Sequence, residues 1–123
     1  EVVEVDTEAW RITRTFATGT DTNPYNLDVT PDGSTLVVTY KGSGETGVWD
    51  LADGTETAVV ANSRSVSHGV VVSPDGRYAF VSAEGIGGEP GALDVIDLQE
   101  GQRVASAAVG KQAGGVALWD LGS

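Results

Sequence analysis

Two short strings of this sequence are near copies of each other, TPDGSTLVV at 30–38 and SPDGRYAFV at 73–81. Their turn prolines, Pro31 and Pro74, lie 43 residues apart. A second marker, a short stretch that ends in aspartate, occurs at 3–6, 47–50 and 94–97, with spacings of 44 and 47 residues. Two independent markers therefore define an internal repeat of about 45 residues.

Each repeat contains four strand-like segments. In the best-defined copy they cover 68–73, 77–83, 93–98 and 103–109, and they are rich in Val, Ile, Ala and aromatic residues with period-two alternation. Pro-Asp-Gly joins the first segment to the second, and Asp-Gly or Glu-Gly joins the third to the fourth. In an up-and-down meander these short turns share one edge of the sheet, so the longer connections lie on the other edge.

Four antiparallel strands in each repeat are typical of β-propeller blades, which are stable only when stacked on neighbouring blades. A β-sandwich would explain the strands but not the period. We therefore predict an all-β fold, a single partial propeller domain of about two and three-quarter blades from a larger ring. Residues 1–18 form the last two strands of a blade, 19–61 and 62–109 form two whole blades, and 110–123 form the first strand of the next blade.

The strings HGVVVSPDGRYAFVSAEG and GALDVIDLQEGQRVASAAVG resemble the YVTN family of β-propeller repeats. The resemblance extends over essentially the whole chain, with departures at Asn26, where glycine is usual, and at 119–122, where WDLG replaces Ser-Pro-Asp-Gly. This repeat occurs in surface-layer proteins, lactonase-like propellers, propeller subunits of quinoprotein dehydrogenases and, distantly, haem-binding nitrite reductase propellers. The resemblance thus implies a periplasmic, secreted or cell-surface protein, and it specifies the fold far better than the activity.

The charge and the residue composition exclude several classes of binding partner and site. A net charge of −11 with seven isolated basic residues argues against nucleic acid and acidic membranes, and no apolar run approaches the roughly 20 residues that cross a bilayer. The acidity fits a cation or a basic partner, and equally fits solubility or adaptation to salt. Cysteine is absent, so no disulfide or thiolate site is available. Because methionine is absent even at position 1, we expect a processed or partial chain.

Ligands of propellers generally bind at the channel mouth on the loop-rich edge. Three equivalent positions at the start of the inner strand carry Tyr25, His68 and Gly114, a variation that suits either a ligand site or drift in exposed loops. The candidate ligand-binding residues at this mouth are Tyr25, Asn26, Arg64, His68, Glu84 and Lys111.

No metal site, cofactor or catalytic residue is expected. His68 is the single histidine, and a multi-histidine metal site requires more. Glu84 and Glu89 flank a glycine-rich loop that has too few oxygen donors to enclose a Ca²⁺ ion. The GIGG of this loop does not indicate phosphate binding either, because it precedes a strand instead of a helix and no Lys-Ser/Thr follows it. The repeated strand-end aspartates and the turn aspartates are assigned to turn hydrogen bonds, and the three tryptophans to packing between blades.

Two function classes follow. We expect a non-catalytic binding or scaffold propeller that offers its loop-rich face to a small ligand or protein partner, so this chain alone is not expected to be an enzyme. The alternative is a fragment of an enzyme propeller, either a lactonase-like hydrolase or a propeller subunit of a quinoprotein or haem oxidoreductase. Blades outside this sequence, or other copies pairing through open strand edges, would complete the ring.

Overall fold

The computed structural model describes residues 1–122, which form ten strands and no helix, so no helix able to cross a membrane occurs there. The strands are β1 (Val2–Asp6), β2 (Arg11–Phe16), β3 (Pro24–Val29), β4 (Thr35–Tyr40), β5 (Glu45–Asp50), β6 (Thr55–Ala61), β7 (Val66–Val72), β8 (Tyr78–Glu84), β9 (Ala92–Asp97) and β10 (Gln102–Ala108).

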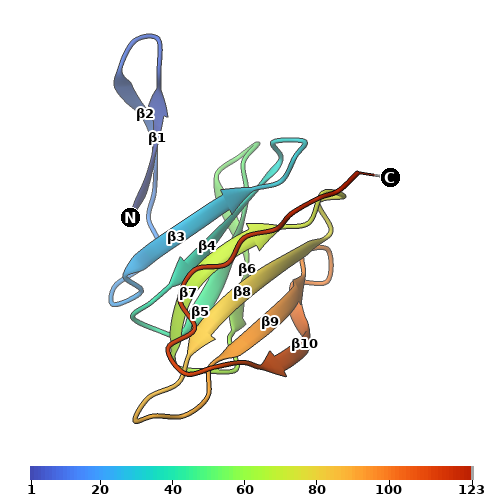
Figure 1. Cartoon of the computed structure of the whole chain (residues 1–123). Helices are drawn as coiled ribbons and strands as arrows, with labels where there is room; N and C mark the ends of the chain where they lie inside the picture. Colours follow the sequence, from blue (N-terminus) through green and yellow to red (C-terminus); the bar gives the residue numbers. More distant parts are fainter. Residues whose placement is uncertain (123) are drawn as a thin grey trace.

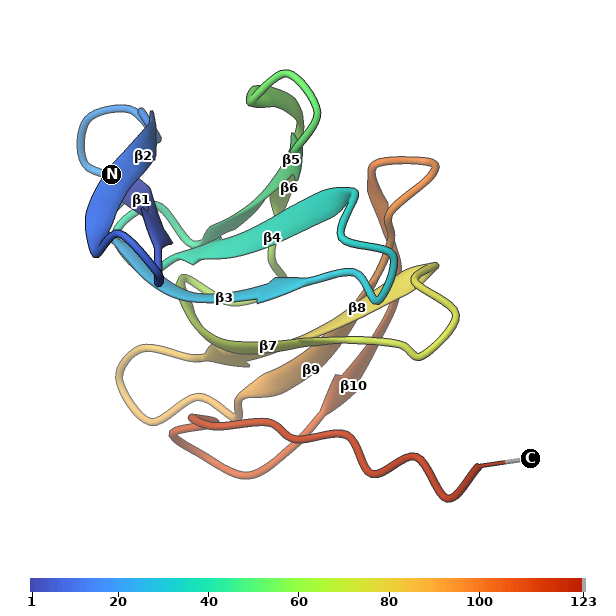
Figure 2. The same cartoon turned by 90° about the horizontal axis from the view of Figure 1, so that it is seen from above.

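These strands form three antiparallel sheets, which we call blades (Figure 1). Blade A is the hairpin β1-β2, blade B has the order β3-β4-β5-β6, and blade C has the order β7-β8-β9-β10. The inner strands β3 and β7 lie side by side, whereas the outer strands β6 and β10 diverge (Figure 2). The predicted all-β fold with four-stranded blades is confirmed.

The short turns lie together on one edge, because Gly76 of the β7–β8 turn packs against Pro31 of the β3–β4 turn. Both glycines of the Pro-Asp-Gly turns have left-handed backbone, with φ of 73° at Gly33 and 72° at Gly76. The strand-end aspartates accept turn N–H groups, as expected: Asp97 Oδ1 accepts those of Gln99 and Glu100 at 3.0 and 3.1 Å.

Asp32 in the β3–β4 turn has a strongly lowered pKa, about 2. The Thr30 hydroxyl donates to Asp32 Oδ1 at 2.6 Å, and the Ser34 N–H and hydroxyl donate to the same atom at 3.0 and 2.8 Å. The stabilisation that this carboxylate contributes is therefore present above its unfolded-state pKa, and it is lost as the pH falls through about 2.

Thr30→Val should raise the pKa of Asp32 towards the ordinary value of about 3.9, because the strongest of these donors is removed. A carbon-detected NMR titration of the Asp32 carboxyl measures the change, with the exposed Thr20→Val as control. An unchanged Asp32 pKa in Thr30→Val would mean that the Ser34 donors alone stabilise the carboxylate.

The blades pack face to face. Between A and B, the Phe16 and Trp49 rings meet edge to face with centroids 5.7 Å apart. Beside them Trp49 Nε1 donates to the Tyr40 hydroxyl at 2.9 Å, and that hydroxyl donates to Glu56 at 2.5 Å. A Cβ at Gly47 would clash with the Tyr40 hydroxyl, so only glycine leaves room for the buried Tyr40–Trp49 hydrogen bond. Burial, and then the bond to Glu56, raises the Tyr40 pKa.

Between B and C, the apolar core consists of side chains from β4, β6, β7, β8 and β9, namely Val37, Val60, Val70, Val72, Ala79, Val81 and Ile96. A buried polar group accompanies this core. Asp94 Oδ2 accepts the Ser63 N–H at 2.7 Å and the Asn62 amide at 3.2 Å, and it lies 3.9 Å from Arg103. Asp94 on β9 thereby anchors the connection that leads from blade B to blade C.

Two expectations differ from the structure. Of the tryptophans only Trp49 is buried: Trp10, in the β1–β2 turn with φ of 50°, is 80% exposed, and Trp119 is 85% exposed. The strand expected over 110–123 is not formed within 110–122, and Ser123 lies outside the described residues. The segment nevertheless lies on blade C as β7 lies on blade B, because the Gly114 carbonyl accepts the Ser82 hydroxyl just as the His68 carbonyl accepts that of Thr39. It has no ladder partner within residues 1–122.

Candidate functional site

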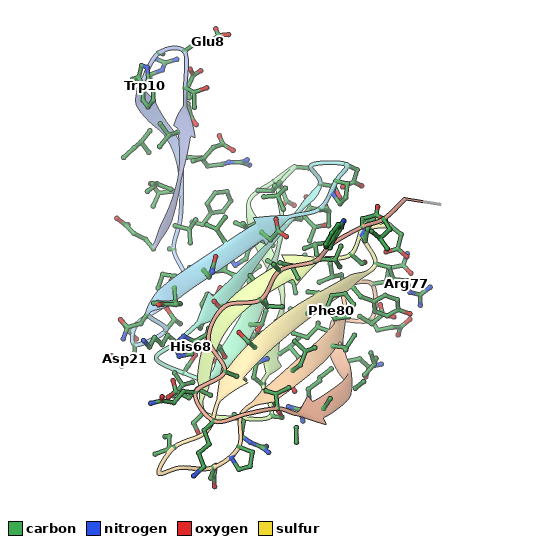
Figure 3. All side chains as sticks on the ribbon, in the orientation of Figure 1. Glu8, Trp10, Asp21, His68, Arg77 and Phe80 are labelled. Atoms are coloured by element: carbon green, nitrogen blue, oxygen red, sulfur yellow. The ribbon has the colours of Figure 1, made fainter. Side chains whose placement is uncertain are left out.

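The loop-rich end of the inner strands brings polar side chains of blades B and C together. Tyr25 is the second residue of β3, Lys41 follows β4, His68 lies in β7, and Glu84 ends β8. Because β3 and β7 are neighbours in space, residues far apart in the sequence meet here (Figure 3, around His68).

His68 and Glu84 form a half-buried pair, with Nε2 and Oε2 2.8 Å apart and side chains 15% and 26% exposed. The register of β7 against β8 shifts between Ser67 and Val70, so His68 occupies a β-bulge, which turns its side chain from the regular alternation. The Thr39 hydroxyl of blade B donates to the His68 carbonyl at 2.6 Å. His68 is thus held by both blades, through its carbonyl by Thr39 of blade B and through its ring by Glu84 of blade C.

Tyr25 contacts both sides of this site. Its ring meets the His68 ring edge to face at 5.3 Å, and Lys41 Nζ lies 4.6 Å from the Tyr25 ring centroid. The Lys41 N–H donates to the Asn23 carbonyl at 3.1 Å, which fixes the β4–β5 loop beside β3. Lys41 was not predicted from the sequence. Two features could have indicated it: it directly follows the second strand of a blade, and it is one of only two lysines in the sequence.

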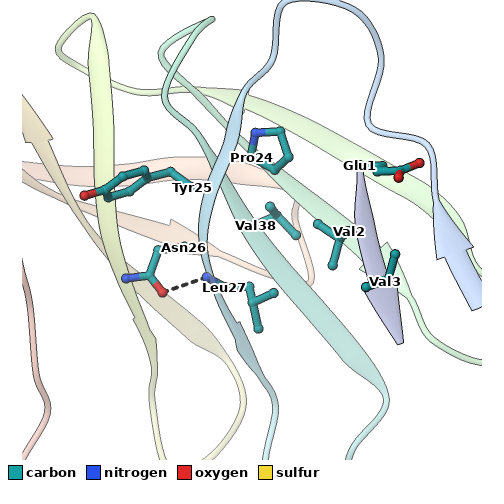
Figure 4. Close-up of a pocket in the computed structure, with 8 residues that line it drawn as sticks. All are labelled: Glu1, Val2, Val3, Pro24, Tyr25, Asn26, Leu27 and Val38. Carbon is teal, nitrogen blue, oxygen red and sulfur yellow. Dashed lines mark hydrogen bonds between the residues drawn. The ribbon is translucent and has the colours of Figure 1, made fainter. Parts of the chain in front are cut away.

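Asn26 follows Tyr25 in β3. Its side-chain oxygen accepts the Leu27 N–H at 2.8 Å. The register of β3 against β4 shifts between Pro24 and Asn26, and in Figure 4 the Asn26 side chain points to the same side of β3 as the Tyr25 ring. Both residues also line a pocket of about 270 Å³ between β1 and β3, whose other lining residues are Glu1, Val2, Val3, Pro24, Leu27 and Val38.

The remaining two candidates surround the loop between β8 and β9. Arg64 donates to the Pro90 carbonyl and to the Ser63 carbonyl, both at 2.8 Å, so its guanidinium holds this loop in place. Lys111 lines a pocket of about 240 Å³ together with Glu84 and the loop glycines. The structure thus brings Tyr25, His68 and Glu84 together, places Asn26 next to Tyr25, and puts Arg64 and Lys111 around the β8–β9 loop.

The chemistry available at this end is that of polar recognition. An exposed aromatic ring, an ammonium group without an ion pair among residues 1–122, and an imidazole–carboxylate pair are present. In the same described range no group of three or more His, Cys, Asp or Glu side chains is arranged to hold a metal ion.

The chain matches no protein-family model and no curated protein. Two solved structures of propeller type share its fold. Hydrazine synthase of Kuenenia stuttgartiensis matches 85% of this chain at 25% identity with a TM-score of 0.69, and U3-55K matches 81% at 18% identity with a TM-score of 0.66. The matches cover 28% and 30% of those chains. Four-stranded antiparallel blades and these neighbours together identify the chain as part of a β-propeller.

Proposed function

We propose that the chain belongs to a non-catalytic binding or scaffold propeller of the YVTN repeat type, which offers its loop-rich channel face to a ligand or protein partner. The observation that carries the proposal is the meeting of Tyr25, Lys41 and His68 from two adjacent blades. Tyr25 is 57% exposed, so an aromatic surface with flanking polar groups is open to a partner. Export to the periplasm, the cell surface or the medium is proposed from the YVTN resemblance.

A second candidate is a fragment of an enzyme propeller. It is favoured by the similarity to hydrazine synthase, of which this chain matches only 28%. In such a protein the His68–Glu84 pair would be one contribution to a site whose other groups come from further blades. A lactonase-like hydrolase or a quinoprotein or haem oxidoreductase would fit this description.

Blade A supports a third part of the proposal, that strands from elsewhere complete the ring. It has two strands where blades B and C have four, and the pocket of Figure 4 lies beside the free edge of β1. The unused backbone groups of that edge can pair with further strands of the same protein or of another copy.

Peptide display on the purified protein tests the binding function. Peptides selected on the wild type should lose about tenfold or more in affinity for the Tyr25→Ala/Lys41→Ala variant, because exposed aromatic and cationic side chains dominate recognition surfaces. Affinities are measured by calorimetry. Gln99→Ala at the short-turn edge serves as the matched control and should leave the affinity unchanged.

Equal binding to the wild type and to the double variant would overturn the proposed binding face. The enzyme alternative is tested on the same protein with a panel of lactones and esters. Turnover that disappears in His68→Gln would favour the hydrolase over the scaffold.

A further inference from the structure

The two ring nitrogens of His68 have different surroundings. Nε2 is hydrogen-bonded to Glu84 Oε2 at 2.8 Å, whereas Nδ1 has no protein hydrogen bond within residues 1–122. In that range the one buried side-chain N or O atom without a partner is Asp94 Oδ1. Since Nδ1 is not among the buried unpartnered atoms, it is open to solvent at the loop-rich end.

The partner of Nε2 determines where the proton of the neutral ring resides. An ionised carboxylate can only accept hydrogen bonds, so Nε2 must donate and carry the proton. The lone pair is then on Nδ1. We infer that Glu84 is a positioning residue that fixes this tautomer, so that His68 Nδ1 accepts a hydrogen bond from a hydroxyl group of a ligand bound beside Tyr25.

The charge beside the Tyr25 ring favours a hydroxyl over an ammonium donor as the ligand group. Lys41 Nζ lies over the Tyr25 ring, and its positive charge disfavours a second cation at the same ring. A neutral ligand that combines a hydroxyl with an apolar face suits both the acceptor and the aromatic surface. This inference rests on the proposed binding function, because it names the ligand chemistry of the same face.

Alkylation by bromoacetamide reports directly on the lone pair. The free ring nitrogen attacks the CH₂ carbon, the C–Br bond breaks, bromide leaves, and the alkylated ring loses its remaining N–H proton. Peptide mapping of the wild type should find His68 alkylated at Nδ1, and long-range ¹H–¹⁵N spectra should find the proton on Nε2. Alkylation at Nε2, or at neither nitrogen, would overturn the inference.

The role of Glu84 is tested with Glu84→Ala. In this variant a product alkylated at Nε2 should also appear, because no carboxylate is bonded to that nitrogen. Glu89→Ala, which alters the same loop without touching His68, should keep the preference for Nδ1 at roughly tenfold or more. A product ratio that stays unchanged in Glu84→Ala would show that the carboxylate does not position the ring.

The ligand class is tested by protection, with alkylation of Lys111 as the internal reference. Glycerol should slow the alkylation of His68, and methylammonium, which offers N–H donors with a positive charge, should not. Protection by methylammonium alone, or by neither probe, would overturn the hydroxyl assignment. Because none of these measurements uses a selected peptide, they can fail while the binding proposal stands, and the reverse also holds.

Discussion

Replacing Ile96 with alanine is expected to lower the free energy of unfolding by about 3 kcal/mol. Ile96 on β9 is fully buried in the core between blades B and C, where it packs with Val37 and Val81. Alanine removes three carbon atoms and leaves a cavity that rigid strands on both sides cannot fill. Urea denaturation of the purified protein, followed by tryptophan fluorescence, measures the loss.

Ile86→Ala is the matched control, since Ile86 lies in the β8–β9 loop and is 63% exposed. Its free energy of unfolding should change by no more than about 0.5 kcal/mol. Similar small losses in both variants would contradict the view that face-to-face packing of the blades carries the stability of this chain.

Asp94→Ala should lower the free energy of unfolding by about 3 kcal/mol, although the side chain that it removes is polar. The Ser63 N–H and the Asn62 amide donate to Asp94 Oδ2 in a fully buried position, and both donors lose their acceptor when the carboxylate is removed. Asp94→Asn retains an acceptor oxygen of the same shape and should cost about 1 kcal/mol. Equal losses in the two variants would mean that charge, and not the acceptor, stabilises this position.

The stability difference between the wild type and Asp94→Asn should also depend on pH. Burial raises the Asp94 pKa, but hydrogen bonds from donors that include Ser63 and Asn62 outweigh it, so the pKa is lowered overall. The charged carboxylate therefore stabilises the fold above its unfolded-state pKa of about 3.9, and this contribution is lost as the pH falls through the lower folded-state value. Denaturation curves between about pH 3 and 7 should show the difference narrowing with acid.

Much of the fold could be predicted from the sequence because it is repeated. A turn such as Ser-Pro-Asp-Gly at 73–76 determines its own hydrogen bonds, and its recurrence fixes the strand count of each blade. The segment after residue 109 lies on blade C in the place that the repeat predicts, but it is not a strand, because a strand also requires a partner for its backbone groups. Trp10 and Trp119 illustrate the same limit, since residue type does not reveal whether a neighbouring blade covers a side chain.

The site was predictable in part. The positions of Tyr25 and His68 followed from their equivalence in the repeat, and the structure brings them into contact. Glu84 was also among the predicted residues, but its pairing with His68 did not follow from the sequence, because it depends on the bulge in β7. Lys41 was not predicted, because it reaches Tyr25 from a loop. Asn26 was assigned to the channel mouth from its neighbour in sequence, and the shift of register at the start of β3 leaves its side chain on the same side of the strand as Tyr25.

Gly47 and Asp94 occupy the same place in successive repeats, opposite Val38 and Val81, and each faces the preceding blade. Gly47 leaves space for the phenol of Tyr40 in its own blade, whereas Asp94 fills the equivalent space with a carboxylate that anchors the connection arriving from blade B. The two blades are therefore not interchangeable. A recombination event that put blade B in the place of blade C would leave the incoming connection without the acceptor that holds it.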